Sequence, residues 1–453
     1  MTTTTNTSRR SPGISGLIAL LAGAHFAHHV LTALIVPLLP FIRDDFGLSY
    51  AQAGLVNSAF TIAYGVAQLP AGWLSDRIGP RYMLLIGISG VAAAGAFIGL
   101  SPAYGALIAG LLLLGVAGGG YHPAASAVIS KVVAPERRGR ALGVHIVGGS
   151  TSHFVAPLIA AGLVSLVGWR GSFLALAAPV AVLGVIIFAL IQRRIHHASG
   201  GAPGYEASAR APQESAGGEG TGTNGDGGPT DEGDAAETGR TTDAPEASEA
   251  SRTTDAPAGG RPRASTALRM TVFLVVTGVI SASVASTIPF IPLYLVDVRG
   301  IDDRLAAGFI SIIFGAGFFA APLGGWLSDV FGRVRVMIAI GLLSAPLLAL
   351  ITVAPFPVVM FILLLAIGTL MFTRMPTAEA HIAAEVSERH RTTVLGIYFF
   401  SGMEGSALLT PLLGSAIDRW GFETALPGLA AGLAAVVAVG GIVLLLGYRR
   451  RPA

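Results

Sequence analysis

The chain has 453 residues, of which 52% are hydrophobic and only 12% are charged. A soluble domain carries about twice that fraction of charge, and a single globular core could not bury so much apolar surface. The composition therefore indicates a membrane protein, and it excludes a soluble enzyme, a nucleic-acid-binding protein and a disordered scaffold. Because cysteine is absent, disulfides, iron–sulfur clusters and thiolate metal sites are excluded as well.

The formal net charge of +3 combines two opposed parts of the chain. Residues 199–260 hold 12 of the 26 acidic residues but only three arginines. Elsewhere the basic residues gather in short clusters between apolar runs, which is where a membrane protein keeps its cytoplasmic anchors. We therefore expect a lipid bilayer, and no nucleic acid, as the partner of these cations.

Twelve apolar runs are long enough to cross a membrane, for which a helix needs about 20 residues. In chain order they are residues 14–42, 51–71, 82–100, 104–132, 141–167, 172–192, 269–296, 305–326, 334–354, 358–384, 394–417 and 424–448. Residues 199–267, between the sixth and seventh runs, contain no Leu, Ile, Val, Phe, Met or Trp. Nothing in that stretch can offset the entropy of ordering the chain, so we expect a disordered tether there, with a regulatory docking site as the alternative.

The order of these segments predicts five parts and an orientation. They are a tail (1–13), a six-helix bundle (14–194), a disordered acidic linker (195–268), a second six-helix bundle (269–448) and a tail (449–453). An even number of spans places both termini on one side, where the tails and loops hold twenty Arg and Lys residues against five on the other side. The positive-inside rule then places the termini and the linker in the cytoplasm. The expected localisation is the cell (inner) membrane, which the chain crosses several times.

The two halves repeat one another. Gly72-Trp73-Leu74-Ser75-Asp76 recurs as Gly325-Trp326-Leu327-Ser328-Asp329, and the same offset of 253 residues relates Pro123 to Pro376. Two halves with the same helix order pack as pseudo-symmetric bundles around a central cavity. The predicted fold class is an all-α membrane protein with 12 transmembrane helices in two pseudo-symmetric six-helix bundles. The matched prolines would let the fourth and tenth helices bend at equivalent hinges.

The repeated loop resembles the signature of the major facilitator superfamily of secondary transporters, and the resemblance covers essentially the whole chain except the linker. Its two copies read Gly72-x-x-x-Asp76-Arg77-x-Gly79-x-Arg81 and Gly325-x-x-x-Asp329-x-x-Gly332-Arg333-x-Arg335. Within the superfamily, two further motifs are similar to the fosmidomycin-resistance group of exporters, so the chain most resembles the fosmidomycin-resistance and drug:proton antiporter groups. The two motifs are His25-Phe26-x-His28-His29 and Gly120-Tyr121-His122-Pro123.

The two signature loops predict a gate at the cytoplasmic ends of the helices. Its members are Asp76, Arg77, Arg81, Asp329 and Arg333. Each aspartate lies where one helix ends and the next begins, so it can accept hydrogen bonds from exposed N–H groups at the positive end of a helix dipole. The arginines can pair with carboxylates of neighbouring loops only while those ends are closed, and such a contact biases the closed state. The alternative is a solvated basic loop that only sets topology.

Ionisable side chains within spans are expensive and mark transport pathways. At ~1.5 Å per residue, Glu404, Arg374, His122, His28 and His153 fall into one layer near the bilayer centre. Glu404 is the only carboxylate near the middle of a span, and we expect it to carry the coupling proton. The alternative is a permanent ion pair with Arg374. The guanidinium of Arg374 suits a carboxylate, phosphate or phosphonate on the cargo, unless its role is only to balance Glu404.

Three histidines share one face of the first span, because His25, His28 and His29 occupy positions i, i+3 and i+4. Imidazole gains and loses protons near neutral pH, so with His122 and His153 they are expected to relay protons or contact an anionic cargo. His25 and His29 also have the spacing of a helical metal pair, but no nearby carboxylate completes a site. We therefore expect no metal site, with a metal cargo as a minor alternative. His145 has no expected role.

These expectations combine into an alternating-access secondary transporter that exports a small organic or drug-like anion in exchange for protons. Proton-coupled uptake of a small metabolite is the alternative, and a sensor or scaffold that no longer moves solute is the third possibility. No phosphate-cradling Gly-Lys-Ser/Thr loop and no nucleophile with a base at sensible spacing is present, so neither an enzyme nor a cofactor is expected. The expected partners are the small-molecule substrate, protons and the bilayer, and the expected state is a monomer.

Overall fold

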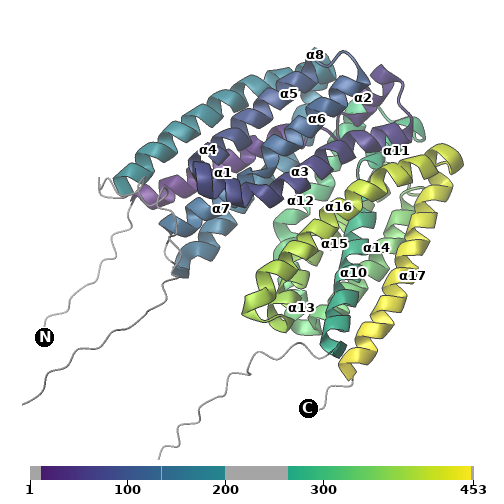
Figure 1. Cartoon of the computed structure of the whole chain (residues 1–453). Helices are drawn as coiled ribbons and strands as arrows, with labels where there is room; N and C mark the ends of the chain where they lie inside the picture. The colour runs from purple at the N-terminus through teal and green to yellow at the C-terminus, as the bar shows by residue number, and fades with distance from the viewer. Residues whose placement is uncertain (1–11, 134, 199–263, 450–453) are drawn as a thin grey trace, which may run out of the picture.

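The computed structural model describes residues 12–133, 135–198 and 264–449, and every regular element in these ranges is helical (Figure 1). Both tails beyond those limits and most of the predicted linker lie outside the described residues. The described helices form two halves on either side of that linker. Each half consists of six helical columns.

In the first half, short breaks divide several of the six columns into shorter helices. The six columns, in chain order, are α1 (Pro12–Thr32) with α2 (Leu39–Phe46); α3 (Tyr50–Ile78); α4 (Pro80–Leu85) with the π-helical turn η1 (Ile86–Gly90) and α5 (Val91–Gly99); α6 (Tyr104–Gly119) with α7 (Tyr121–Val132); and the two arms of α8 (Pro135–Ala198), which count as two columns. The arms of α8 meet at Gly168, whose φ of 70° is a conformation that glycine adopts without strain. This turn gives the two separate spans that the sequence predicts.

The second half repeats this order with fewer breaks. Its columns are α10 (Ala264–Thr287) with α11 (Phe290–Asp297), α12 (Asp303–Gly315) with α13 (Gly317–Phe331), α14 (Arg333–Leu350), α15 (Val358–Glu385), α16 (Glu388–Trp420) and α17 (Phe422–Arg449). The signature glycines Gly79 and Gly332 adopt φ values of 91° and 88° at equivalent turns, between α3 and α4 and between α13 and α14. The predicted fold class of two six-helix bundles is confirmed.

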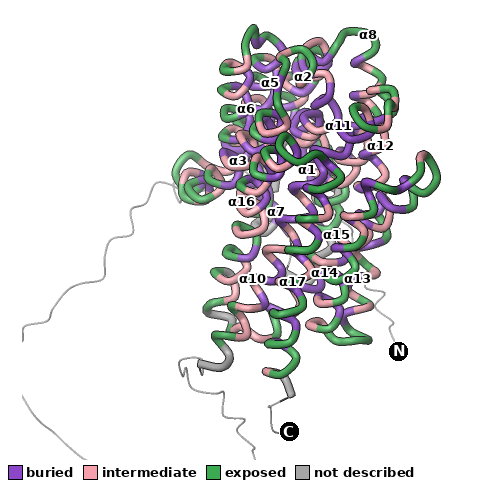
Figure 2. Tube along the Cα trace, turned by 90° about the vertical axis from the view of Figure 1, so that its right-hand side faces the viewer, coloured by how far each residue is buried: buried purple, intermediate pink, exposed green. Residues whose placement is uncertain are grey.

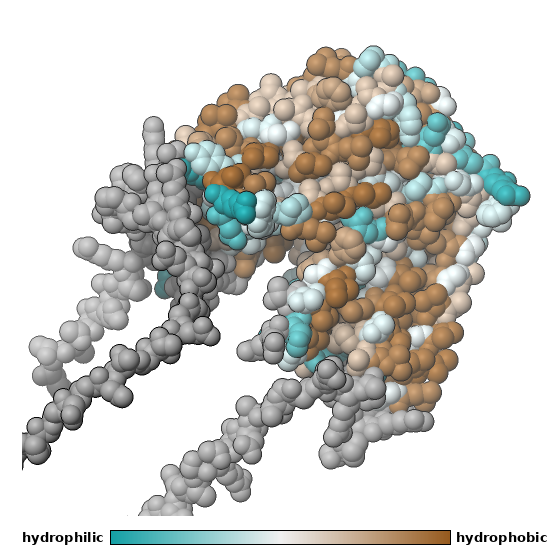
Figure 3. Space-filling view, viewed as in Figure 1, coloured by the Kyte–Doolittle hydropathy of each residue, from teal (hydrophilic) through white to brown (hydrophobic). Residues whose placement is uncertain are grey.

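The surface of the described part is suited to a bilayer. Eight stretches are long and apolar enough to span a membrane, and one of them, Ala141–Leu190, contains both arms of α8. Columns α1, α3 and α16 are not among these stretches; α1 has a shorter apolar segment, Gly16–Thr32. Figure 3 shows apolar residues over both halves and hydrophilic residues gathered at the ends.

Buried residues follow the inward sides of the helices, and exposed residues follow the outside of the molecule (Figure 2). The halves converge at the end away from the termini, where α2 contacts α11, and they diverge toward the end that bears the N- and C-termini (Figure 1). Helices α3 and α16 run against each other between the halves, and α8 of the first half also contacts α12 of the second.

Candidate functional site

Helices α3 and α16 form the central contact between the halves, and small residues let their backbones approach closely. The Ser58 hydroxyl donates to the carbonyl of Ala407 at 2.6 Å. A Cβ atom on Gly54 would lie 3.0 Å from the backbone of Pro411. Such close packing is how helices associate within a membrane, where apolar burial alone gives little preference.

At the end away from the termini, charged and polar groups join the two halves. The backbone N–H groups of Tyr50 and Ala51 each donate to the Asp418 carboxylate at 2.8 Å. The Tyr50 hydroxyl donates to Asp297 at 2.7 Å, and an Nη atom of Arg43 lies 3.1 Å from the same carboxylate. Asp418, on α16, thus places a negative charge at the positive end of α3, which is a favourable arrangement.

This end contact, which we call the outer lock, consists of Arg43, Tyr50, Asp297 and Asp418. None of the four residues is picked out as functional by the sequence, where Arg43 serves only in the count of loop charges. The two carboxylates lie about 250 and 370 residues from their partners along the chain. No local pattern connects residues so far apart, so only the tertiary structure reveals the lock.

At the opposite end, the predicted gate residues are placed on both halves but do not meet. Asp76 and Arg77 are exposed, and neither forms an ion pair with a described residue; the Arg77 guanidinium lies 4.0 Å from the centre of the Trp73 ring. Asp329 and Arg333 line a surface cavity of about 720 Å³ at the end of the second half. Figure 3 shows the molecular surface notched between the halves on this side.

Glu404 lies in the contact between α16 and α3. Its Oε1 atom is buried and has no hydrogen-bond partner within the described part of the chain. A Cβ atom on the facing Gly65 would overlap this oxygen, so the glycine makes room for the carboxyl group. The sequence-predicted proton carrier therefore lies at the boundary between the two halves.

Arg374 lies within the second half, and it does not pair with Glu404. One Nη atom of Arg374 donates to the Tyr398 hydroxyl at 2.8 Å, and the guanidinium lies 5.6 Å from the centre of that ring. The residue also lines a small cavity of about 20 Å³ together with Ser281 and Ser344. The permanent ion pair, which the sequence left open as an alternative, is absent from this conformation.

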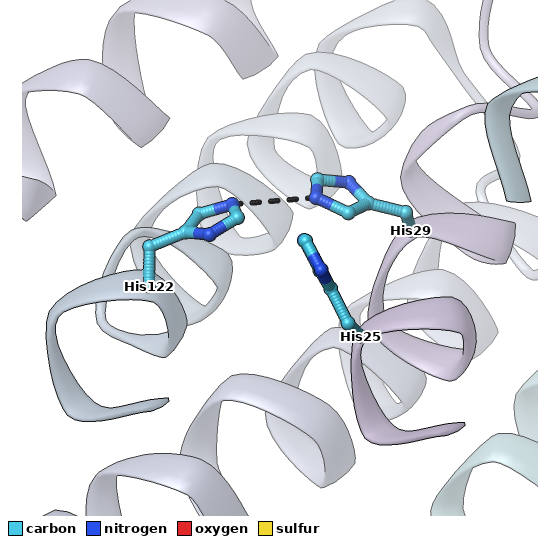
Figure 4. A group of neighbouring side chains, drawn as sticks. All are labelled: His25, His29 and His122. Carbon is cyan, nitrogen blue, oxygen red and sulfur yellow. Dashed lines mark hydrogen bonds between the residues drawn. The ribbon is translucent and has the colours of Figure 1, made fainter. Parts of the chain in front are cut away.

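The histidines of the first half come together in one cluster. Its members are His25, His28 and His29 of α1, His122 of α7, and His145 and His153 of α8. The Nε2 atoms of His29 and His122 lie 3.3 Å apart (Figure 4). The ring of His145 stacks on His25 at a centroid distance of 4.3 Å, so the structure adds to the cluster a residue to which the sequence assigned no role.

Backbone carbonyls orient the deeper rings of the cluster. Nδ1 of His25 lies 2.9 Å from the carbonyl oxygen of His145, and Nδ1 of His28 lies 2.7 Å from that of Gly87. Because a carbonyl only accepts, both Nδ1 atoms carry the proton. His25 and His28 are buried, whereas His29, His122 and His153 are partly exposed. His29, His122 and His153 thus form the less buried side of the cluster.

The cluster extends to the second half through His153. Its ring stacks on Phe314 of α12 at a centroid distance of 5.2 Å and lies 4.7 Å from the ring of His29. Rearrangement of the contact between α8 and α12 would therefore move one side of the cluster. This places the histidines beside the interface that separates the halves.

Comparison with known proteins identifies the family. The model of the Major Facilitator Superfamily matches residues 21–321 and 273–453. The chain belongs to this superfamily. It is therefore a multi-pass membrane protein of a family that transports small molecules, as the resemblance of its signature loops predicted.

Several named proteins of the superfamily are similar to parts of the chain. The fosmidomycin resistance protein of Escherichia coli is 27% identical over 189 residues, which are 42% of this chain and 45% of that protein. The tetracenomycin C resistance and export protein of Streptomyces glaucescens is 32% identical over 161 residues, 34% of this chain and 30% of that protein. An uncharacterized transporter of Mycobacterium tuberculosis is 37% identical over 159 residues, which are 35% of this chain and 27% of that protein. The matches thus span less than half of these relatives.

Solved structures of the superfamily share the whole fold. A bacterial homologue of the human lysosomal transporter Spinster, in an inward-facing and occupied conformation, has a TM-score of 0.68 and 15% identity, and the match covers 97% of this chain and 96% of that one. A peptide transporter crystallised with sulfate has a TM-score of 0.70 and 14% identity, covering 96% and 94%. At such identities the likeness concerns the fold alone.

The predicted hinge prolines differ in their setting within this fold. Pro123 is the third residue of α7, directly after the break at Gly120 that separates α7 from α6. Pro376 lies inside α15, which continues through it. Pro376 removes one backbone hydrogen bond inside α15 and so reduces its stiffness. Pro123 lies in the first turn of α7, where no such bond is lost, and the weak point there is the break at Gly120. The break at Gly120 has no counterpart in the equivalent column of the second half, where α15 is continuous.

Proposed function

We propose that the chain is a proton-coupled exporter of small organic anions that works by alternating access in the cytoplasmic membrane. The outer lock holds the halves together at one end, while they part at the end that bears the termini. With the termini in the cytoplasm, this arrangement is the inward-facing member of an alternating pair. The opposite member would require the outer lock to open.

Glu404 is the proposed proton carrier, and the state of its Oε1 atom is the observation that carries this proposal. A carboxylate oxygen buried without a partner is costly when ionised, so the contact with Gly65 is suited to the neutral, protonated carboxyl group. Separation of α3 from α16 would admit water to that oxygen and favour loss of the proton. Protonation and conformation are thereby linked at one residue.

The cargo in this proposal is a small organic anion. Arg374 is the one arginine or lysine near the middle of a span, and the histidine cluster adds polar groups beside the second half, which His153 contacts through Phe314. Two relatives are named for resistance to, or export of, antibiotics, which favours export over uptake. Bending of α7 near Pro123 and of α15 near Pro376 would then let the two halves rock between the inward-facing and outward-facing states.

The signature loops complete the cycle as a gate on the cytoplasmic side. Asp76, Arg77 and Arg81 of the first half and Asp329 and Arg333 of the second lie at the parted end of the molecule. When the halves close there, charges of the two loops can pair and stabilise the outward-facing state. The gate and the outer lock would alternate, because one must open as the other closes.

The test is proton-driven transport in everted membrane vesicles, with fosmidomycin and tetracenomycin C as the first probes. Glu404→Gln is expected to abolish accumulation driven by an imposed pH gradient, because the amide cannot exchange a proton. Glu423→Gln, which changes an exposed carboxylate at the start of α17, is the matched control and should transport normally.

Undiminished gradient-driven transport by Glu404→Gln would remove Glu404 from the role. Transport in the opposite sense, with accumulation in whole cells, would replace export by uptake. If a wider panel of organic anions is moved in neither direction, the transporter proposal itself is wrong and a sensor is favoured.

A further inference from the structure

The histidine cluster contains three rings whose nitrogens are placed as metal ligands are. One ring nitrogen each of His25, His29 and His122 lies within 4.8 Å of the other two. Figure 4 shows His29 and His122 facing one another, with the outer edge of the His25 ring directed at the space between them. Two ligands come from α1 and the third from α7, so the site is formed by tertiary packing.

One distance in this group already matches metal coordination. Two nitrogens bound at about 2.0 Å to a tetrahedral Zn²⁺ lie about 3.3 Å apart. The Nε2 atoms of His29 and His122 are separated by 3.3 Å. The third nitrogen is farther away, and a tilt of the His25 ring would bring it into the same sphere. A hydrogen bond between the two imidazoles explains this one distance but leaves His25 unexplained.

The unpartnered Nε2 atom of His25 is the observation that points to a bound ligand. The His25 side chain is 5% exposed, and its Nδ1 proton is donated to the His145 carbonyl, which leaves Nε2 with a free lone pair. That Nε2 atom is buried and finds no hydrogen-bond partner among the described residues. A ring that donates one N–H to a backbone carbonyl and keeps the other nitrogen bare is how proteins hold a metal-ligating histidine.

We propose that His25, His29 and His122 bind one divalent transition-metal ion of the zinc class between α1 and α7. Imidazole ligands select zinc, copper, nickel or cobalt, whereas magnesium and calcium require oxygen ligands. Three ligands leave a fourth coordination position open. His29 and His122 are partly exposed, so water or an anionic group of a solute can occupy that position.

The proposal reverses the expectation of no metal site drawn from the sequence. That expectation rested on the lack of a carboxylate near His25 and His29. The structure supplies a third imidazole instead, from a residue 93 positions beyond His29. The inference does not depend on transport, because binding is measured on the purified protein at rest.

The experiment uses the full chain, purified with a tag that contains no histidine and stripped with a chelator. Titration with Zn²⁺ by calorimetry is expected to give one site per chain, and Co²⁺ is expected to give the visible absorption of a four-coordinate ion. Zinc-edge X-ray absorption of the unmodified protein should report three nitrogens at about 2.0 Å. This last measurement needs no variant and therefore no assumption about folding.

Variants assign the ligands. His25→Gln, His29→Gln and His122→Gln are each expected to weaken Zn²⁺ binding by about 100-fold or more, since even the loss of a residue that only orients a ligand weakens binding about 10- to 100-fold. His390→Gln, at the exposed start of α16, is the matched control and should bind as the unmodified chain does. Zn²⁺ should also raise the melting midpoint of the control but not of the three variants.

The proposal is overturned if the stripped protein shows no saturable site for Zn²⁺ or Co²⁺. It is overturned equally if His29→Gln and His122→Gln bind as tightly as the control. Glu404→Gln is expected to retain the metal, so loss of proton coupling and loss of metal binding are separate results. Failure of either proposal therefore leaves the other standing.

Discussion

Gly65 and Gly115 are two glycines in close contacts whose substitution should impair different properties, transport at Gly65 and stability at Gly115. A Cβ atom on Gly65 would overlap only Oε1 of Glu404, the far end of a flexible side chain. A Cβ atom on Gly115 would lie 2.6 Å from the carbonyl oxygen of Phe60 and 2.8 Å from the amide nitrogen of Tyr64. The first obstacle can move aside, whereas the second is the backbone of α3 and cannot.

We therefore expect Gly65→Ala to fold normally but to lose proton-coupled transport, because the carboxyl group is displaced from its buried position. Gly115→Ala should instead lower the free energy of unfolding by about 1–3 kcal/mol through overpacking. The two effects are separated by the melting midpoint in detergent and by gradient-driven uptake in vesicles. Equal loss of stability in both variants, or normal coupling in Gly65→Ala, would contradict this account of Glu404.

At the scale of elements, the outer lock depends on the end of one helix capping the start of another. Asp418 near the end of α16 accepts from the first backbone N–H groups of α3, which no residue of α3 itself can satisfy. Nearby, Arg170 and Asp45 form an ion pair with N···O 2.6 Å, but both belong to the first half. The two carboxylates are thus a natural pair of test and control.

Asp418→Ala is expected to favour the state in which the outer lock is open by about 5- to 30-fold, since hydrogen bonds to a charged group contribute about 1–2 kcal/mol at an exposed site such as this one. The chain contains no cysteine, so Ser58→Cys, buried under α16, can report opening through its reaction with a membrane-impermeant maleimide. Labelling should accelerate in Asp418→Ala and stay unchanged in Asp45→Ala. Identical rates in both backgrounds would mean that the cap does not hold the halves together.

At the scale of the whole molecule, transport requires the halves to part where the outer lock now joins them. Arg43 and Asp297 lie on opposite halves, whereas Asp45 and Arg170 lie on the same half at the same end. A covalent bridge across the first pair should stop the cycle. A bridge across the second should not.

The measurement is uptake by vesicles carrying Arg43→Cys with Asp297→Cys, cross-linked by a short bismaleimide. We expect transport to fall to background after cross-linking, and to remain in the uncross-linked double variant. Asp45→Cys with Arg170→Cys should transport before and after the same treatment. Continued transport by the first cross-linked pair would refute a rocking motion of the two halves.

The sequence by itself determined the number and order of the helical columns, the repeat and the family. Apolar runs of spanning length, the turn glycines Gly79 and Gly332 and the loops around Asp76 and Asp329 are local features, so they can be read along the chain. The spacing of His25, His28 and His29 likewise placed them on one helical face. Depth along a helix is also local, and it predicts Glu404 near the middle of a span; the residue lies within α16.

Only the tertiary structure decided which of these residues meet. The contacts of Asp418 with Tyr50, of His122 with His29 and of Glu404 with Gly65 join residues far apart in the chain. Equal depth in the membrane does not specify the direction in which a side chain points. Arg374 therefore contacts Tyr398 and not Glu404, although the sequence places Arg374 and Glu404 at the same depth. Rotation and packing of each helix depend on the surfaces of all its neighbours, and that information lies in no single segment.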